Sequence, residues 1–236
     1  MFNRIAMGLC LGLLMAAPAG ASEAFIRKAF QVKFPDMKIE SITRTPFQGV
    51  YEVVFDGQVV YIDEKFTYLM SGNLFDLRDV KERNLTGERR GQIAAGALVK
   101  AQGNAIKRVK GSGKRVVYTF EDPNCGYCKE LQKEINKMND ITVYTFLLPI
   151  LSPDSVEKSK AVWCAKDRAK TWDDLMSKAS LPANAPTNCT TPLEENQALA
   201  QRFGVRGTPA VYLANGQQVG GFLPADKLEQ ALAALK

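Results

Sequence analysis

Two cysteines, Cys125 and Cys128, stand two residues apart between a compact β run and a helical segment. The β run is RVVYTF, residues 115–120, and a second apolar run, residues 141–148, has the length of a buried strand. The segment after the cysteines carries large apolar residues at helical spacing: Leu131, Ile135 and Met138. The chain around this motif must therefore supply a strand, a helix and a second strand in that order.

That order begins a thioredoxin-like unit, in which the cysteine pair lies at a helix N-terminus. The first amide N–H groups of a helix lack backbone partners and carry a partial positive charge, so they stabilise an anion. Cys125 would be that anion, because the thiolate is the attacking species in disulfide exchange. Cys128 would attack the mixed disulfide formed at Cys125 and resolve it. Gly126 leaves room for a protein substrate, and Tyr127 offers it an aromatic surface.

Charged residues flank the motif and act in opposite directions. Lys129, one helical turn from Cys125, favours the thiolate, whereas Glu121 and Asp122 just upstream oppose it. Which charge dominates does not follow from the sequence, and Lys129 is also typical of a solvated helix face.

Zinc binding is the alternative role for the pair, because two cysteines in this spacing commonly supply two of the four ligands of a zinc ion. The chain has no histidine, however, and Cys164 and Cys189 lie 25 residues apart instead of forming a second such pair. The sequence therefore predicts no metal site and no organic cofactor. A structural bond between Cys125 and Cys128 would close too short a loop to stabilise the fold much.

Cys164 and Cys189 suit a structural role better. They bracket a helical stretch with a proline-containing tail, and a crosslink over 25 residues contributes about 3 to 4 kcal/mol in the chain-entropy description. Four cysteines allow three pairings, so the sequence alone leaves this pairing open.

The first 21 residues read as a secretory signal peptide, with Arg4, an apolar run ending at Ala17 and small residues up to Ala21. The run is shorter than the roughly 20 residues that a membrane-spanning helix needs. Its removal takes Cys10 away and leaves 215 residues, with the net charge lowered from +6 to +5. Such a mild excess, with no long block of like charge, does not indicate a nucleic-acid partner.

The front of the mature chain is predicted to be a small domain, residues 22–83. A short helix stops at Pro35, and β-rich runs are broken by Asp56-Gly57 and Ser71-Gly72, which is typical of an antiparallel meander. A domain of about 60 residues buries a modest core, so pairing with a second copy would stabilise it. We expect a dimerisation module, with a monomeric domain that covers the catalytic one as the alternative.

A linking segment, residues 84–110, is expected to join the front domain to a catalytic domain, residues 111–236. Good helix formers run from Glu88 to Gln102, and Gly111 and Gly113 follow as flexible punctuation. The predicted fold class is α+β: a β-rich front domain, a linker helix, and a thioredoxin-like α/β domain with a helical insertion.

Three segments, FEDPNCGYCKEL, AVWCAKDRA and FGVRGTPAVYLANGQQVGGFLP, together resemble the DsbC type of periplasmic thiol:disulfide interchange proteins. The resemblance covers the whole mature chain and implies a V-shaped homodimer joined through the front domains, with two thioredoxin-like domains facing an apolar cleft. It implies misoxidised exported proteins as substrates and a DsbD-type membrane electron transporter as reductant. It also makes Cys164 and Cys189 the structural disulfide.

The same resemblance gives roles to the remaining site residues. Cys125 is the nucleophile and Cys128 the resolving thiol, while Thr208-Pro209 matches a cis-proline segment beside the active site. The sequence by itself favours an ordinary proline at the start of a strand, because cis is the minority state, and only the resemblance reverses this expectation. A cis bond would expose the Thr208 backbone for a substrate peptide to pair against. Lys129, where some members carry histidine, and the acidic approach to Cys125 leave the redox potential open.

The sequence therefore predicts a periplasmic disulfide isomerase that works through a reduced CxxC pair. A DsbG-like reductase of cysteines oxidised to sulfenic acid would use the same thiol chemistry on a different lesion. A chaperone-like binder and a direct oxidase are further alternatives, although the family's monomeric oxidases lack the front domain.

Overall fold

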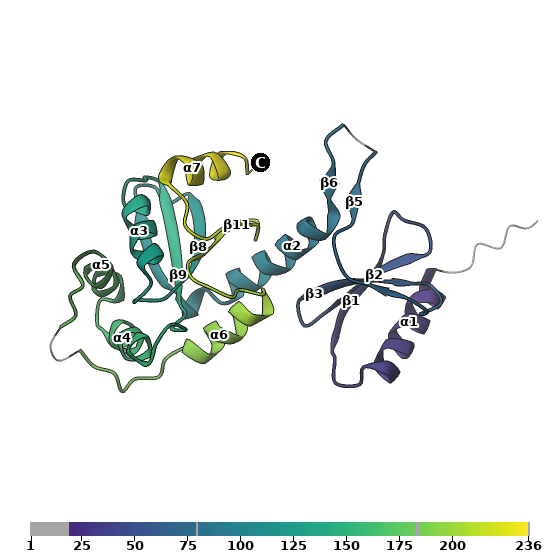
Figure 1. Cartoon of the computed structure of the whole chain (residues 1–236), viewed down its shortest axis with the longest axis horizontal. Helices are drawn as coiled ribbons and strands as arrows, with labels where there is room; N and C mark the ends of the chain where they lie inside the picture. The colour runs from purple at the N-terminus through teal and green to yellow at the C-terminus, as the bar shows by residue number, and fades with distance from the viewer. Residues whose placement is uncertain (1–18, 79, 183–184, 236) are drawn as a thin grey trace, which may run out of the picture.

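The structure, a computed structural model, describes residues 19–78, 80–182 and 185–235. A front domain and a larger C-terminal domain are joined by helix α2 (Leu85–Lys100), as Figure 1 shows. The predicted α+β class is confirmed. The expected signal peptide lies outside the described residues except for its last three positions, where helix α1 (Ala19–Lys33) begins. Within the described ranges, no helix combines the length and apolarity that a membrane span requires.

The front domain is the antiparallel meander that the sequence predicted. Four strands pair in chain order: β1 (Ile39–Arg44), β2 (Val50–Phe55), β3 (Gln58–Asp63) and β4 (Leu69–Met70). Asp56 and Gly57 form the tight turn between β2 and β3, and both have positive φ angles, 46° and 75°. Asp-Gly suits this turn because aspartate tolerates the left-handed region and glycine adopts it freely. Helix α1 covers one face of the sheet by burying Ile26 and Phe30.

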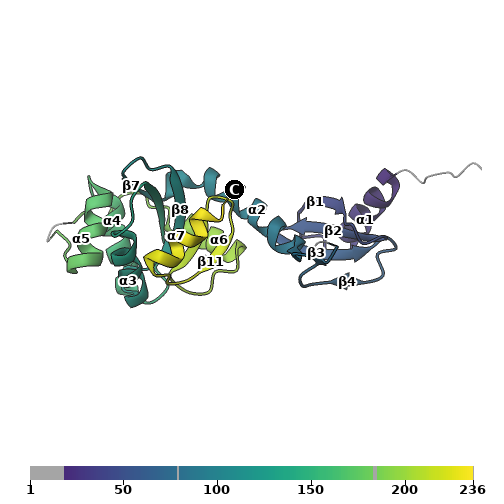
Figure 2. The same cartoon turned by 90° about the horizontal axis from the view of Figure 1, so that it is seen from above.

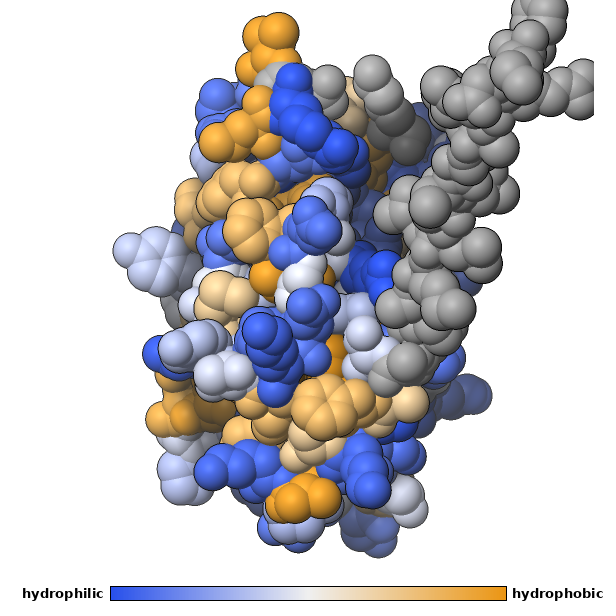
Figure 3. Space-filling model, turned by 90° about the vertical axis from the view of Figure 1, so that its right-hand side faces the viewer, coloured by the Kyte–Doolittle hydropathy of each residue, from blue (hydrophilic) through white to orange (hydrophobic). Residues whose placement is uncertain are grey.

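Large apolar side chains remain exposed at the β4 edge of this sheet and on the separate two-stranded sheet that follows it. They lie on or beside β4, on β5 (Phe75–Asp76) and in the connection toward β6 (Arg83–Asn84): Tyr68, Leu69, Met70, Phe75, Leu77 and Val80. Figure 3 views this end of the molecule and shows apolar side chains gathered between charged ones. An edge strand also presents unpaired backbone N–H and C=O groups. The front domain thus presents an apolar edge rather than a uniformly polar surface.

The linking helix α2 begins three residues earlier than the helix formers suggested. The Asn84 side chain accepts the Gly87 N–H at 2.8 Å and caps the helix, which places its first turn at Leu85. The helix ends at Lys100, and a short 3₁₀ turn, η1 (Gln102–Asn104), follows.

The C-terminal domain is built on a five-stranded sheet in the order β11-β10-β8-β9-β7. Its strands are β7 (Ile106–Lys110), β8 (Arg115–Glu121), β9 (Ile141–Leu147), β10 (Ala210–Leu213) and β11 (Gln218–Gly220). Strands β8 and β9 run parallel, and every other pair is antiparallel. The predicted strands on either side of the cysteine motif are therefore neighbours in the centre of the sheet.

Helices cover both faces of this sheet. Helices α3 (Gly126–Ile135) and α7 (Ala225–Ala233) bury their apolar residues against one face, whereas α2 and α6 (Leu193–Arg202) pack on the other. Two further helices, α4 (Pro153–Cys164) and α5 (Arg168–Lys178), form the helical insertion between β9 and α6. Figure 2 shows α2 running from this layered domain to the front domain at the opposite end.

Residues 106–110 were expected to lie in the linking segment, but they form strand β7. All five residues of β7 pair with β9. The segment IKRVK gives a weak strand signal, and it is ordered by the ladder to β9 and by the burial of Ile106. Gly111 and Gly113 are the tight β7–β8 turn instead of flexible punctuation. Both have positive φ angles, and a Cβ at Gly111 would lie 2.9 Å from the Asp140 backbone nitrogen.

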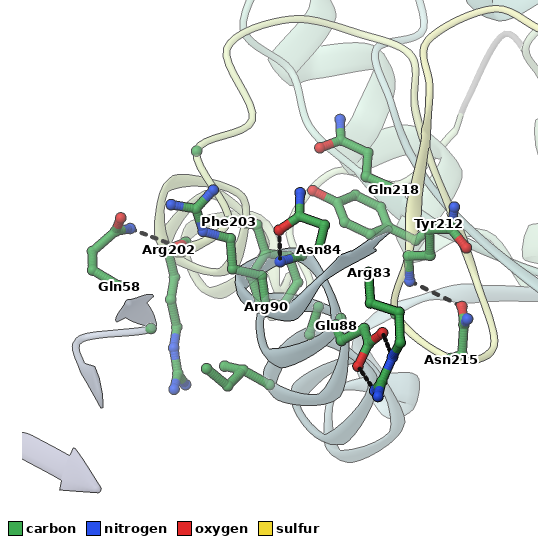
Figure 4. Close-up of a pocket in the computed structure, with 18 of the residues that line it drawn as sticks. Gln58, Arg83, Asn84, Glu88, Arg90, Arg202, Phe203, Tyr212, Asn215 and Gln218 are labelled. Atoms are coloured by element: carbon green, nitrogen blue, oxygen red, sulfur yellow. Dashed lines mark hydrogen bonds and ion pairs between the residues drawn. The ribbon is translucent and has the colours of Figure 1, made fainter. Parts of the chain in front are cut away.

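The C-terminal domain contacts both the linking helix and the front domain. A Cβ at Gly216, in the β10–β11 turn, would lie 2.0 Å from the Gly91 carbonyl oxygen of α2, so only glycine allows this approach. Arg202, the last residue of α6, donates to both carboxylate oxygens of Glu40 at 2.7 and 2.8 Å. A cavity of about 850 Å³ lies beside these contacts and is lined by polar and apolar residues of α2, α6, the β10–β11 turn and the β2–β3 turn of the front domain (Figure 4). Neither cysteine of the CxxC motif lines it.

Candidate active site

Three chain segments meet at one edge of the five-stranded sheet. Because β8 and β9 are parallel, both end at the same edge, and β10, antiparallel to β8, starts there. Cys125 follows β8 in the centre, the segment 148–151 follows β9 on one side, and Thr208-Pro209 precedes β10 on the other. The topology therefore assembles a site from residues more than 80 positions apart.

Both cysteines of the motif are free thiols at the start of α3, as the sequence predicted. Cys125 is the N-cap of this helix, and its sulfur accepts the Cys128 N–H at 3.3 Å. Both side chains are buried, Cys128 completely, among residues of α4 and α5. An N–H group directed at the Cys125 sulfur stabilises negative charge there.

Thr208 and Pro209 lie directly beside Cys125. The bond between them is cis, and the Cys125 thiol donates to the Thr208 carbonyl oxygen at 3.2 Å. The Thr208 hydroxyl is buried and has no hydrogen-bond partner among the described residues. These contacts bring the proline segment to the Cys125 sulfur.

Gly126 and Tyr127 form the outer surface of the motif. Nothing lies within 4 Å of a Cβ built at Gly126, so this position opens to solvent beside Cys125. Tyr127 is exposed, and its ring centroid is 6.3 Å from that of Phe222, in the segment between β11 and α7. Sequence reasoning identified Tyr127 but gave no role to Phe222, which lies 95 residues away and whose position depends on the sheet order.

Glu121 lies in the interior beneath the motif. It is fully buried and accepts hydrogen bonds from the Gln132 amide at 2.7 Å and the Thr119 hydroxyl at 2.6 Å. Burial raises the pKa of this carboxyl, although the Arg108 charge and the hydrogen bonds act against it. Burial likewise raises the pKa of the Cys128 thiol well above its ordinary value, and the Glu121 charge raises it further. Glu121 thus acts on the deeper cysteine, which a reading of flanking charges did not anticipate.

Asp122 holds the turn that leads into Cys125. Its carboxylate accepts the Asn124 N–H and the Ser155 hydroxyl, both at 2.8 Å, and the Leu151 N–H at 3.0 Å. Its backbone carbonyl accepts the Cys125 N–H at 3.0 Å. Asp122 therefore ties the β8 exit, the β9 exit and α4 together, and sequence reasoning had assigned it only a charge.

The remaining cysteines form a disulfide. Cys164 ends α4 and is bonded to Cys189, in the segment before α6, with a Cα–Cα distance of 5.7 Å. Over the ranges that the structure describes, no cluster of three or more histidine, cysteine, aspartate or glutamate side chains is placed to hold a metal ion.

Two family matches cover the chain. Residues 102–236 match the thioredoxin-like domain, and residues 16–87 match the N-terminal domain of disulfide bond isomerase proteins. The first match starts at the 3₁₀ turn before β7, which agrees with the place of that strand in the C-terminal sheet.

Relatives extend over nearly the whole chain. It is 42% identical over 217 residues to the probable thiol:disulfide interchange protein DsbC of Bordetella parapertussis, covering 92% of this chain and 76% of that one. It is 31% identical over 236 residues to the thiol:disulfide interchange protein DsbC of Escherichia coli K12, covering 95% and 94%. Among solved structures, a disulfide interchange protein from Neisseria gonorrhoeae is 41% identical with a TM-score of 0.54, covering 56% of this chain and 95% of that one. On the combined evidence of both domains, the paired cysteines and these relatives, the chain belongs to the DsbC family of thiol:disulfide interchange proteins.

Proposed function

We propose that this protein is a periplasmic disulfide isomerase in which Cys125 is the nucleophile. The observation that carries the proposal is the position of its sulfur, between the Cys128 N–H and the Thr208 carbonyl oxygen, at 3.3 and 3.2 Å. The N–H stabilises the thiolate, and the adjacent cis-proline segment offers backbone groups to which an extended substrate can pair. Misoxidised exported proteins are the substrates of this proposal.

The exchange needs no net oxidant or reductant. The Cys125 thiolate attacks one sulfur of a substrate disulfide, a new S–S bond forms, and the other substrate sulfur leaves as a thiolate. That thiolate attacks a second disulfide of the same substrate, and the substrate thiolate released there attacks the mixed disulfide. Cys125 then leaves as the thiolate with which the cycle began.

Cys128 supplies a slower escape when rearrangement stalls. Its sulfur attacks Cys125 in the mixed disulfide, the substrate leaves as a thiol with the Cys128 proton, and the enzyme is left with a Cys125–Cys128 disulfide. Because the pKa of Cys128 is raised by burial and by Glu121, its thiolate is scarce and the escape is slow. The mixed disulfide then persists long enough to rearrange. Restoring both thiols requires two electrons, for which we propose a DsbD-type membrane electron transporter.

Dimerisation through the front domain completes the proposal. The β4 edge of its four-stranded sheet carries exposed apolar residues, as does the separate strand β5, and the matched N-terminal family is that of disulfide bond isomerases. Pairing of this edge with a second copy would satisfy its backbone groups and bury the apolar side chains. Light scattering of the mature chain at micromolar concentration should give twice the monomer mass, and a monomer mass would overturn this part.

The activity is tested by recovery of a scrambled multi-disulfide protein with reduced mature enzyme and with the Cys125→Ser variant. Recovery by the wild type alone supports isomerisation through Cys125. If neither enzyme restores activity although the pair is reduced, the proposal fails, and a protein sulfenate becomes the next substrate to try. Aggregation suppression that survives loss of both thiols would indicate a chaperone-like binder instead.

A further inference from the structure

The cavity of about 850 Å³ between the two domains lies apart from the cysteine pair, and the proposed disulfide exchange gives it no role. Sites for small molecules commonly have volumes of about 300 to 1,000 Å³ and often lie where domains meet. Both domains enclose this cavity, through the β2–β3 turn, residues 81–84, helix α2, the end of α6 and the β10–β11 turn. The cavity therefore has the size and the place of a ligand site.

The charged side chains around the cavity leave one positive charge on α2 without an acidic partner. Arg83 pairs with Glu88 at 2.6 Å, and Arg202 pairs with Glu40 at 2.7 Å. Arg90 also lines the cavity and is exposed, and no carboxylate of the described residues lies within ion-pair distance of it. Figure 4 shows its guanidinium extending from α2 toward the end of α6. This guanidinium is available to an anion.

A buried hydroxyl lines the same cavity. Tyr212, on β10, is 3% exposed, and its hydroxyl has no hydrogen-bond partner in the parts of the chain that the structure describes. Burial raises the pKa of Tyr212 to about 12, so the hydroxyl keeps its proton at neutral pH. A buried polar group is costly to leave without a partner. A ligand oxygen that accepts this proton would supply the missing hydrogen bond.

Apolar side chains complete the lining. Ile93 of α2 and Phe203, which follows α6, both face the cavity, and the Phe203 ring centroid is 5.6 Å from that of Tyr212. The remaining charged residues of the lining, Lys81 and Glu82, are adjacent and opposite in sign. Apolar surface with a few placed polar groups is typical of a site for an organic molecule.

We propose that this cavity binds a small organic anion whose carboxylate or phosphate pairs with Arg90, whose apolar body packs on Phe203, and which accepts a hydrogen bond from Tyr212. A guanidinium suits both anionic groups because it can donate two parallel hydrogen bonds to either. The site does not involve the thiols. The inference therefore goes beyond the proposed disulfide exchange and does not depend on it.

A ligand in this cavity would contact both domains at once. Gln58 of the front domain lines the cavity and donates to the Arg202 carbonyl oxygen at 3.3 Å, whereas Arg90 belongs to the linking helix and Tyr212 to the C-terminal sheet. The anion would thus bind the observed arrangement of the two domains and stabilise it by mass action.

The test is isothermal titration calorimetry of the full mature chain with four probes: phenylpropionate, phenyl phosphate, the neutral phenylpropionamide and inorganic phosphate. The two aromatic anions should bind and compete with each other for one site. The neutral amide should bind about tenfold more weakly, because it forms no charge-assisted hydrogen bond with a guanidinium. Inorganic phosphate should also bind more weakly, because it has no apolar body to bury. The tighter of the two aromatic anions identifies the preferred charged group.

Variants then place the binding in this cavity. Arg90→Gln should weaken the aromatic anions about tenfold and leave the affinity for the neutral amide unchanged. Tyr212→Phe removes only a hydroxyl that has no partner, so the fold is kept, and the anions should bind about fivefold more weakly. Arg27→Gln is the matched control, because Arg27 is also an exposed helical arginine but lies on α1 and does not line the cavity.

Equal affinities for the aromatic anions and the neutral amide would overturn the anion site. So would wild-type affinity in both Arg90→Gln and Tyr212→Phe, or the absence of saturable binding of either aromatic anion at millimolar concentration. The effect of Arg90→Gln is read as the ratio of anion to amide affinity on one protein, so a partly folded sample does not mimic it. Cys125→Ser should bind the anions as the wild type does, which distinguishes a failure of this site from a failure of the proposed exchange.

Discussion

The two cysteine pairs differ in bonding state, and this difference does not follow from how exposed their side chains are. Cys125 and Cys128 are buried and remain free thiols, whereas Cys164 is half-buried and Cys189 is exposed, and these two are bonded. The free pair lies at a sheet edge, where a helix begins and the cis-proline segment approaches. The bonded pair closes a loop of 25 residues that contains α5, the second helix of the insertion. If Cys125 is the nucleophile that we propose, then position relative to helix N–H groups and to the cis-proline backbone, and not exposure, separates reactive from structural sulfurs.

The same comparison explains why burial matters at one cysteine pair and not at the other. At Cys128, burial beside Glu121 raises the pKa of the thiol, and in the proposed mechanism this delays the second exchange step. At the disulfide, the bond restrains the unfolded chain and needs no special surroundings. Removing one pair should therefore affect catalysis, and removing the other should affect stability.

The largest expected effect is loss of isomerisation in Cys125→Ser. Serine places an N-cap oxygen where Cys125 has the sulfur that accepts the Cys128 N–H, so the free energy of unfolding should change by less than about 1 kcal/mol. Recovery of a scrambled protein should fall to the rate without enzyme, measured together with a urea unfolding curve. The matched variant, Cys164→Ser with Cys189→Ser, should retain most of its activity at 25 °C. If that variant also lost all activity while folded, the separation of roles would be wrong.

The second prediction concerns the stability that the bonded pair supplies. Removing the Cys164–Cys189 disulfide should lower the free energy of unfolding by about 3 to 4 kcal/mol, because the unfolded chain gains entropy. The midpoint of urea unfolding measures this change, with Cys125→Ser as the control that keeps the disulfide. An unchanged midpoint would mean that the helical insertion is held by packing alone.

Much of this arrangement could be predicted from local sequence patterns. The strand, CxxC, helix and strand order and the Asp56-Gly57 turn depend on residues close in sequence, and both were found where they were expected. Strand β7 was missed because its order comes from the ladder to β9, and Phe222 because it approaches Tyr127 only through the order of the sheet. Glu121 was interpreted as a charge that flanks Cys125, but it is the last residue of β8, whose end is buried on both faces, so its side chain lies in the protein interior.

A third prediction tests the effect of the buried Glu121 carboxylate on Cys128 of the free pair. In Glu121→Gln the like charge near Cys128 is absent, so the pKa of Cys128 should fall and the escape step should become faster. Release of a trapped peptide from its mixed disulfide with Cys125 measures this step. Cys164→Ser with Cys189→Ser serves as the control and should leave the release rate unchanged. Slower release in Glu121→Gln would contradict the prediction that the Glu121 charge slows the attack by Cys128.

The same substitution has a signature in the pH dependence of stability. Because burial raises the pKa of Glu121 in the folded protein, the folded state binds this proton more tightly than the unfolded state does. Its contribution to stability is therefore complete below the unfolded pKa and is lost as the pH rises through the folded pKa. Relative to the wild type, Glu121→Gln should be more stable at neutral pH than at pH 4, measured by urea unfolding. An equal difference at both pH values would mean that Glu121 is not desolvated.

The smallest effect is expected at Ser155, which touches neither sulfur. Its hydroxyl donates to the buried Asp122 carboxylate at 2.8 Å, and Asp122 in turn accepts the Leu151 N–H and, through its carbonyl, the Cys125 N–H. Ser155→Ala removes this bond together with the contacts of the hydroxyl to the Asn124 amide and the Ser152 hydroxyl, and the bond to the charged group alone should cost about 1.5 to 3 kcal/mol of stability. Because the turn before Cys125 loosens, mixed-disulfide formation should slow a few-fold, whereas release of the trapped peptide should not change. Ser155→Thr keeps the hydroxyl and should restore the rate. A change in release alone would place Ser155 with Cys128 instead of with the nucleophile.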